Sequence, residues 1–215
     1  FLNFMDRIYI FDTTLRDGGQ TKGVDFSFAD KIAISEALDD IGIDYIEGGW
    51  PGANPTDDKL FSSPPKLKVS NFVAFGMTRR PNSSAANDPG LSAVLNGKSD
   101  SVCLVGKTWD FHVDKALNIS LEENIKMIED SINEANKRGK EALFDCEHFF
   151  DGFKNNKSFA IDCVKAATDA GSKWVVLCDT NGGTLPNEVS EIIQEVKSLI
   201  PNAPLGIHCH NDSGT

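Results

Sequence analysis

The chain alternates short apolar runs with amphipathic stretches along its whole length. Seven runs have the composition of β-strands, at 8–11, 45–47, 72–75, 102–105, 142–144, 174–178 and 206–208. Their apolar residues are continuous rather than alternating with polar ones, which is typical of parallel strands that are covered on both faces.

Helical patterns separate most of these runs. Helices are predicted from Ser27 to Gly42, from Ser120 to Gly139, around 159–167 and from Pro186 to Pro201, with shorter ones at 56–61 and 90–96. Ser120 and Glu123 form the S-x-x-E pattern of a capping box, and glycines follow three of the long helices. Repeated strand–helix–strand units predict a parallel sheet with right-handed crossovers.

Two α/β architectures have this pattern: a TIM-type (β/α)8 barrel and an open, doubly wound sheet. Residues that can do chemistry follow the first, fifth, sixth and seventh runs, and a barrel gathers all strand ends around one mouth. No GxGxxG follows the first run, which disfavours a dinucleotide-binding sheet. We therefore expect residues 1–215 to form a catalytic (β/α)8-type barrel that is incomplete because an eighth strand is missing. We also expect Met5 to be the natural start of a longer protein.

Composition excludes several functions. The net charge of −11, without clusters of basic residues, excludes a general nucleic-acid binder, and no apolar stretch approaches the ~20 residues of a membrane span. The cysteines number five, and none are spaced as CxxC. Buried, reduced thiols in the cytoplasm explain them, with a catalytic role for Cys209 as the alternative.

Two histidines at the end of the chain, His208 and His210, are separated by one residue on the seventh predicted strand. Side chains two positions apart point to the same face, so both imidazoles can bind one ion; alternatively, they are a polar pair at a strand end. Near the start, Asp17 offers a carboxylate for a hard cation, and Arg16 offers permanently charged donors for an oxyanion. The alternative for Arg16 and Asp17 is a surface ion pair in a turn.

The fifth predicted strand ends with two carboxylates, Asp145 and Glu147, on one face. Carboxylates inside a barrel are unfavourable unless they are paired or functional, and Glu147 is the better acid or base because it lies nearer the mouth. Its alternative is a structural ion pair with an arginine. Thr180, after the sixth strand, is a candidate donor to a substrate carboxylate.

Four further polar residues have weaker signals. Arg79 and Arg80 follow the third predicted strand and are candidates for an anion such as a coenzyme A phosphate, with a solvated turn as the alternative. His112 and His148 are expected to be solvated loop histidines.

Two motifs at opposite ends of the chain, FDTTLRDGGQ and GIHCHND, resemble the first-strand and seventh-strand signatures of the DRE-TIM metallolyase superfamily. The segments DYIEGGWPGANP, AFGMTRRP, GKTWDFHV, EHFFDGFK and LCDTNGGTLP are similar to the branch of 2-isopropylmalate, homocitrate and citramalate synthases, and most similar to citramalate synthases. The resemblance implies an acyltransferase that condenses acetyl-CoA with pyruvate to citramalate, for isoleucine biosynthesis. The alternatives are another 2-oxo acid, a carbon–carbon lyase or aldolase like HMG-CoA lyase, and a metal-binding fragment without turnover.

The resemblance also implies the roles of individual residues. It assigns the metal to Asp17, His208 and His210, catalysis to Arg16 and Glu147, and substrate binding to Arg16 and Thr180. The family's remaining ligand, an asparagine on an eighth strand, and its C-terminal lid and regulatory regions are not in this chain. Oxygen and imidazole ligands admit Mn, Mg, Zn or Co. The implied partners are acetyl-CoA, a small 2-oxo acid and a second copy in a homodimer.

Overall fold

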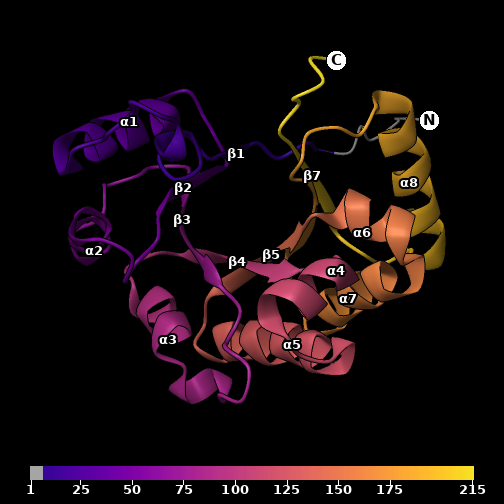
Figure 1. Ribbon diagram of the computed structural model, residues 1–215. Helices are drawn as coiled ribbons and strands as arrows, with labels where there is room; N and C mark the ends of the chain where they lie inside the picture. Colours follow the sequence, from indigo (N-terminus) through magenta and orange to yellow (C-terminus); the bar gives the residue numbers. More distant parts are fainter. Residues whose placement is uncertain (1–6) are drawn as a thin grey trace, which may run out of the picture. The chain divides into compact units, whose positions relative to one another are not determined.

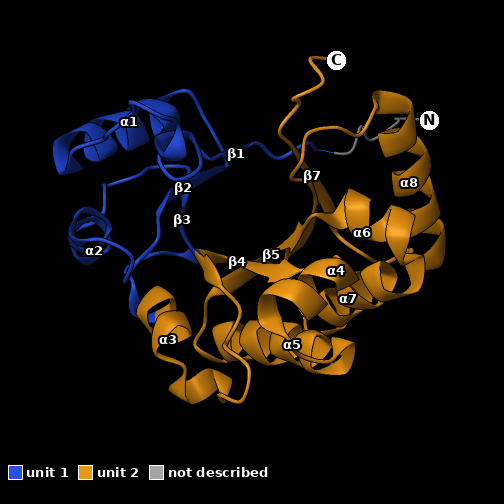
Figure 2. Ribbon diagram, viewed as in Figure 1, with its two compact units in different colours: residues 1–75, 96–101 blue, residues 76–95, 102–215 orange. Residues whose placement is uncertain are grey.

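The computed structural model describes residues 7–215, which separate into two compact units (Figure 2). Among the described residues, the first unit spans 7–75 and 96–101, and the second spans 76–95 and 102–215. The predicted start at Met5 lies outside the described residues.

All the predicted strands are confirmed (Figure 1). Their bounds are β1 (Phe11–Asp12), β2 (Tyr45–Gly49), β3 (Asn71–Met77), β4 (Ser101–Lys107), β5 (Glu141–Glu147), β6 (Trp174–Asp179) and β7 (Leu205–Cys209). β1 is shorter than predicted, whereas the other strands extend beyond their apolar runs. The extension of β5 places both Asp145 and Glu147 inside the strand.

The predicted helices are also confirmed, and the structure adds short ones. The longer helices are α1 (Phe28–Asp40), α2 (Pro55–Ser62), α3 (Pro89–Asn96), α5 (Leu121–Lys137), α7 (Lys157–Asp169) and α8 (Pro186–Leu199). Those not predicted are α4 (Asp110–His112), α6 (Phe149–Asn155), the 3₁₀ turns η1 (Gly18–Gln20) and η2 (Ala85–Asn87), and the π-helical turn η3 (Val113–Leu117). No helix among residues 7–215 is long and apolar enough to span a membrane.

The first unit contains β1, β2 and most of β3, in that order and parallel, with α1 and α2 packed on β2. Phe11 pairs with Tyr45, and Ile46 pairs with Phe72. Ile46 and Leu60 are fully buried at the centre of this unit. The register shifts between Glu47 and Gly49, so β2 ends in a bulge beside the residues that follow β1.

Ser27 caps the N-terminus of helix α1 as predicted, but the buried face of the helix differs from the prediction. Ser27 and Asp30 form a reciprocal capping box. The apolar residues at 32, 34 and 38 are only half-buried, whereas the buried side chains of α1 are Lys31, Ser35 and Asp39. This face is polar because it binds polar groups of the segments beneath it.

Asp39 shows how the polar face of α1 is stabilised. Its carboxylate accepts hydrogen bonds from the backbone N–H groups of Lys68 (2.7 Å), Ser70 (2.8 Å) and Val69 (2.9 Å). Burial alone would raise the pKa of the Asp39 carboxyl, but these hydrogen bonds outweigh it and hold the pKa well below its usual value. A charged Asp39 therefore fixes the loop that leads into β3.

In the second unit the strand order is β4-β5-β6-β7, and β5, β6 and β7 pair in parallel. α5 and α7 lie side by side and pack on the sheet (Figure 1), with Phe144, Ile128, Ile132 and Leu177 fully buried between these layers. The Ser120 half of the predicted capping box is confirmed, because its hydroxyl accepts the N–H of Glu123.

Candidate active site

In the first unit, Arg16 is held by two carboxylates and an aromatic ring. Its Nε donates to Glu47 Oε2 at 2.6 Å, and its Nη1 lies 3.2 Å from Asp17 Oδ1. The guanidinium carbon is 4.0 Å from the centre of the Phe75 ring. Glu47 has no exposed side-chain surface and that of Arg16 is 11% exposed, so this is not the surface ion pair of the alternative interpretation. Arg16 is a pre-oriented cation.

The turn after β1 presents Arg16 and Asp17. The Asp12 carboxylate closes it by accepting hydrogen bonds from the backbone N–H (2.9 Å) and the hydroxyl (3.1 Å) of Thr14. The N–H groups of Arg16 and Gly18 both donate to the carbonyl oxygen of Thr13. The DTTLRDG segment therefore forms its own hydrogen-bonded turn.

A cavity of about 370 Å³ opens beside Arg16 in this unit. Its lining includes Leu15, Arg16, Gln20, Phe26, Trp50 and Asn54. The lining also contains a second cation, Lys31, and two carboxylates, Asp25 and Asp57, so it is strongly polar beside the aromatic surface of Phe26 and Trp50.

One wall of the cavity contains a buried ion pair. Lys31 Nζ contacts Asp57 Oδ1 and donates to the carbonyl oxygen of Gly48 at 2.9 Å, and both charged side chains are less than a tenth exposed. Asp57 Oδ2 accepts the backbone N–H of Trp50 at 2.9 Å. Gly49, with φ of +150°, permits this approach because a Cβ there would lie 2.5 Å from the Asp57 carboxyl carbon.

In the second unit, Glu147 forms an ion pair with Lys107 Nζ, rather than with an arginine as the alternative interpretation expected. The backbone of Glu147 is fixed as well, because its carbonyl oxygen accepts the N–H of Thr108 at 3.2 Å and the Thr108 hydroxyl at 2.8 Å. The ends of β4 and β5 are thus joined around a charged, three-quarters buried carboxylate.

Thr180 immediately follows β6 and lies beside the residue after Glu147. Its Oγ1 accepts the backbone N–H of His148 at 2.9 Å. The structure therefore brings the end of β5 and the turn after β6 together, as the sequence analysis expected of strand ends in a parallel sheet.

His208 and His210 point to the same side of β7. Their rings are stacked, with centroids 4.9 Å apart and planes inclined by 19°, which confirms that the two imidazoles share one face. A nitrogen of His208 also lies within 4.8 Å of an Asp145 oxygen and the Cys178 sulfur. A buried carboxylate beside a histidine can fix the tautomer of a metal ligand. Asp17 belongs to the first unit and the histidines to the second, so the shared metal site stays a prediction.

The prediction of solvated histidines is wrong for His148. Its side chain is only 14% exposed, and its ring packs on His112 (centroids 4.5 Å apart) and Trp109 (5.8 Å). His112 is half-buried, and burial, together with His148 and Lys107, lowers its pKa. The sequence signal for this cluster was the aromatic residues in two segments: WDFH, which follows β4, and EHFF, which begins at the last residue of β5.

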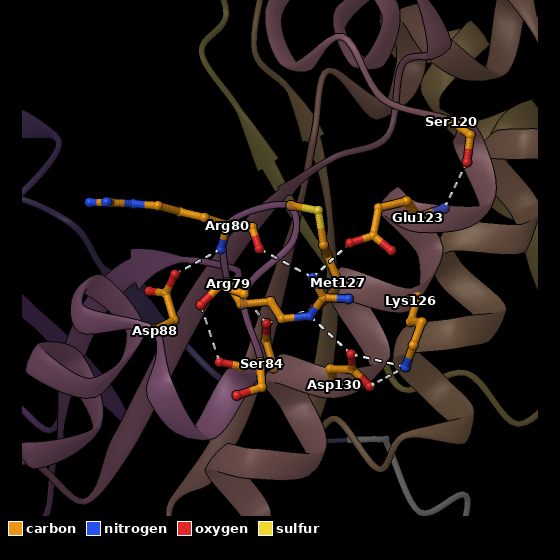
Figure 3. Close-up of polar contacts among 11 residues, drawn as sticks. Arg79, Arg80, Ser84, Asp88, Ser120, Glu123, Lys126, Met127 and Asp130 are labelled. Atoms are coloured by element: carbon orange, nitrogen blue, oxygen red, sulfur yellow. Dashed lines mark hydrogen bonds and ion pairs between the residues drawn. The ribbon is translucent and has the colours of Figure 1, made fainter.

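Arg79 is buried rather than solvated (Figure 3). Its Nη1 donates to Glu123 Oε1 at 2.8 Å, and its Nε donates to Asp130 Oδ2 at 2.9 Å. Arg80 has an exposed side chain, and its backbone N–H donates to Asp88. Arg79 is therefore a structural cation that joins the end of β3 to α5, and it is not available for a phosphate.

The prediction that the cysteines are buried is confirmed for all of them except Cys209. Cys103, Cys146, Cys163 and Cys178 are buried, and Cys209 is exposed. Burial raises the pKa of Cys146 and Cys163 well above the usual value, and burial and Asp179 raise that of Cys209. A raised pKa disfavours the thiolate that a catalytic cysteine needs.

The comparison with protein families identifies the chain. The model of the HMGL-like family matches residues 7–215, so the chain belongs to this family of DRE-TIM metallolyases, as the resemblance predicted. Among solved structures, the HMG-CoA lyase of Bacillus subtilis has a TM-score of 0.79 at 21% identity, covering 98% of this chain and 70% of that one. The HMG-CoA lyase of Brucella melitensis has a TM-score of 0.78 at 18% identity, covering 98% and 74%. The fold is a TIM-barrel-like α/β fold that is incomplete, as predicted.

Curated relatives are more similar in sequence. The chain is 50% identical to the (R)-citramalate synthase of Aquifex aeolicus over 212 residues, and 50% identical to that of Geobacter sulfurreducens over 211 residues. The 2-isopropylmalate synthase of Rhodopseudomonas palustris is 30% identical over 212 residues. These alignments cover 97–98% of this chain but only 40%, 40% and 39% of the respective relatives.

Proposed function

We propose that this chain is the catalytic part of an acyltransferase that condenses acetyl-CoA with pyruvate to give citramalate. The observation that carries the proposal is the difference in identity: 50% to two (R)-citramalate synthases, against 30% to a 2-isopropylmalate synthase, over the same length. Pyruvate, rather than a larger 2-oxo acid, is accordingly the preferred acceptor.

Asp17, His208 and His210 are the proposed ligands of a divalent cation. One carboxylate and two imidazoles suit Mn²⁺, Zn²⁺ or Co²⁺ and also admit Mg²⁺. The stacked pair on β7 supports a shared face for the two imidazoles, and Asp145 beside His208 supports a fixed ring orientation. The cation would supply Lewis-acid polarisation of the keto group of the 2-oxo acid.

Thr180 and Arg16 are the proposed contacts of the 2-oxo acid. The Thr180 hydroxyl donates to the carboxylate of the acid, and Arg16 stabilises the negative charge that develops on the keto oxygen. The rigid setting of Arg16, between Glu47, Asp17 and the Phe75 ring, supports this role because a pre-oriented cation needs no rearrangement during the reaction.

The acetyl group supplies the new carbon–carbon bond. A base removes a proton from its methyl group, and the resulting enolate carbon attacks C2 of pyruvate, whose keto oxygen takes the electron pair and then a proton to become the hydroxyl group. Glu147 is the proposed acid–base residue at this centre, and its ion pair with Lys107 supports a charged carboxylate there. Water then cleaves the thioester, which releases coenzyme A as the thiol and citramalate as the acid.

The test uses the extended protein, meaning this chain together with whatever its gene encodes after Thr215. Thiol release from acetyl-CoA is followed with pyruvate, 2-oxoisovalerate or 2-oxoglutarate, and the product is identified by mass spectrometry. The proposal expects citramalate and the highest kcat/KM with pyruvate. A higher kcat/KM with another 2-oxo acid would reject pyruvate. Cleavage of citramalyl-CoA or a related thioester without any condensation would instead indicate a lyase.

A further inference from the structure

The backbone at His148 has a conformation that is uncommon for residues other than glycine. His148 stands between the end of β5 and α6 with φ of 56° and ψ of 35°, in the left-handed region. Among residues 7–215, the other non-glycine residues with positive φ are all asparagines, at 82, 118 and 211. Asparagine and histidine adopt this region more often than other non-glycine residues do, and such a conformation persists where the surrounding structure holds it.

The left-handed turn aims the N–H of His148 at Thr180. Its hydrogen bond to Thr180 Oγ1 measures 2.9 Å. A hydroxyl has one proton to donate, and its oxygen can accept at the same time. Because the oxygen already accepts the amide of His148, the Thr180 hydroxyl is held in one place with its proton left for another acceptor.

A second connection holds the same two loops together. Asp151 on α6 accepts the side-chain amide of Asn181 at 3.0 Å, and its Oδ2 lies 3.5 Å from His148 Nδ1. The middle of α6 is also packed tightly against the end of β4, because a Cβ at Gly152 would lie 2.2 Å from the carbonyl oxygen of Thr108. The turn at His148 is therefore fixed from both sides.

We propose that His148 is a positioning residue for binding of the 2-oxo acid: its left-handed backbone presents the amide that orients the Thr180 hydroxyl toward the substrate carboxylate. The inference rests on the proposed function and extends it to a residue that does not touch the substrate. This role belongs to the backbone conformation of His148 rather than to its imidazole. Mutations that remove the imidazole but differ in their tolerance of positive φ can therefore separate the two contributions.

Two substitutions at His148 distinguish backbone from imidazole in the extended protein. Glycine removes the ring but adopts positive φ freely, whereas alanine removes the ring and disfavours positive φ. We expect His148→Gly to keep the KM for pyruvate within about twofold of the wild type. We expect His148→Ala to raise it about tenfold, which corresponds to about 1.4 kcal/mol. Asn118→Ala is the matched control, because Asn118 has a similar φ of 52° on an exposed turn and should leave this KM unchanged.

A double-mutant cycle tests whether His148 acts through Thr180. Thr180→Val removes the hydroxyl, and we expect His148→Ala to raise the KM for pyruvate no further in that background. Equal effects of His148→Gly and His148→Ala, additive effects in the double variant, or an effect of Asn118→Ala equal to that of His148→Ala would each overturn the inference.

Hydrogen–deuterium exchange of the His148 amide gives a readout that does not need turnover. Thr180→Val should accelerate this exchange, and Thr180→Ser should preserve the protection. Unchanged exchange in Thr180→Val would overturn the inference even if citramalate is formed. If the wild type shows protected exchange but condenses no 2-oxo acid, the proposed function fails and the substrate role of His148 fails with it, whereas the structural contact stands.

Discussion

The buried pair of Lys31 and Asp57 should contribute more to stability than any exposed ion pair in the first unit. For unit charges about 3 Å apart, Coulomb's law gives about 5.5 kcal/mol at an effective dielectric constant of about 20. Desolvation offsets part of this attraction, but removal of one partner leaves the other charge buried, which costs about 3–5 kcal/mol. In Lys31→Met, Asp57 keeps the hydrogen-bond donors of Trp50 and Asn54. We therefore expect the free energy of unfolding to fall by about 3 kcal/mol, the lower end of this range.

Urea unfolding followed by far-UV circular dichroism measures this loss. Lys68→Met is the control, because Lys68 pairs with Asp40 at 2.7 Å with side chains that are 75% and 64% exposed. We expect the control to change the free energy of unfolding by less than about 1 kcal/mol. A loss of less than about 1 kcal/mol in Lys31→Met, with an unchanged dependence on urea, would refute the reasoning, because the charge of Asp57 would then be solvated or neutralised.

Three further predictions concern the site and the packing around it. Arg16→Lys in the extended protein should lower kcat by at least about 100-fold without lowering the metal content, because lysine lacks the planar donors that face the oxyanion. Steady-state kinetics measures kcat, and elemental analysis measures the bound metal. A parallel loss of metal would contradict the role of Arg16 in stabilising the oxyanion. Since folding lowers the pKa of Asp39, its contribution to stability is present above the unfolded pKa of about 3.9 and disappears as pH falls toward the folded value. Urea midpoints measured from pH 7 to pH 3 should therefore fall less steeply in Asp39→Asn than in the wild type, and equal slopes would reject this assignment. Gly152→Ala should lower stability by about 1–3 kcal/mol because its Cβ meets the carbonyl of Thr108, whereas Gly183→Ala, with nothing within 4 Å of its Cβ, is the control in the same thermal melt.

The strands and long helices could be predicted because their signals are local. Continuous apolar runs marked every strand, and the capping residue Ser27 marked the start of α1. The buried face of α1 could not be predicted in this way, because Lys31 and Asp39 are buried by partners that come later in the chain, at Asp57 and at residues 68–70. Polar residues that look exposed on a helix can thus form its packed face.

The site was predictable where a motif was specific, and not where geometry depends on distant residues. Arg16 and Glu147 were selected by residue type, yet their ion-pair partners, Glu47 and Lys107, lie on neighbouring strands. Arg79 was misjudged because its acidic partners are 44 and 51 residues further along the chain. Nothing local in the EHFF segment predicts a left-handed His148, whose amide meets a hydroxyl 32 residues away.

Removal of the metal tests whether the proposed condensation depends on a metal bound by Asp17. Pyruvate-dependent thiol release by the extended protein would be measured after chelation and again after Mn²⁺ is restored, in the wild type and in Asp17→Asn. We expect the wild type to lose turnover on chelation and to regain it with Mn²⁺, and we expect Asp17→Asn to stay inactive at the same Mn²⁺ concentration. Full pyruvate-dependent turnover by verified metal-free wild type, or by Asp17→Asn without bound metal, would contradict it.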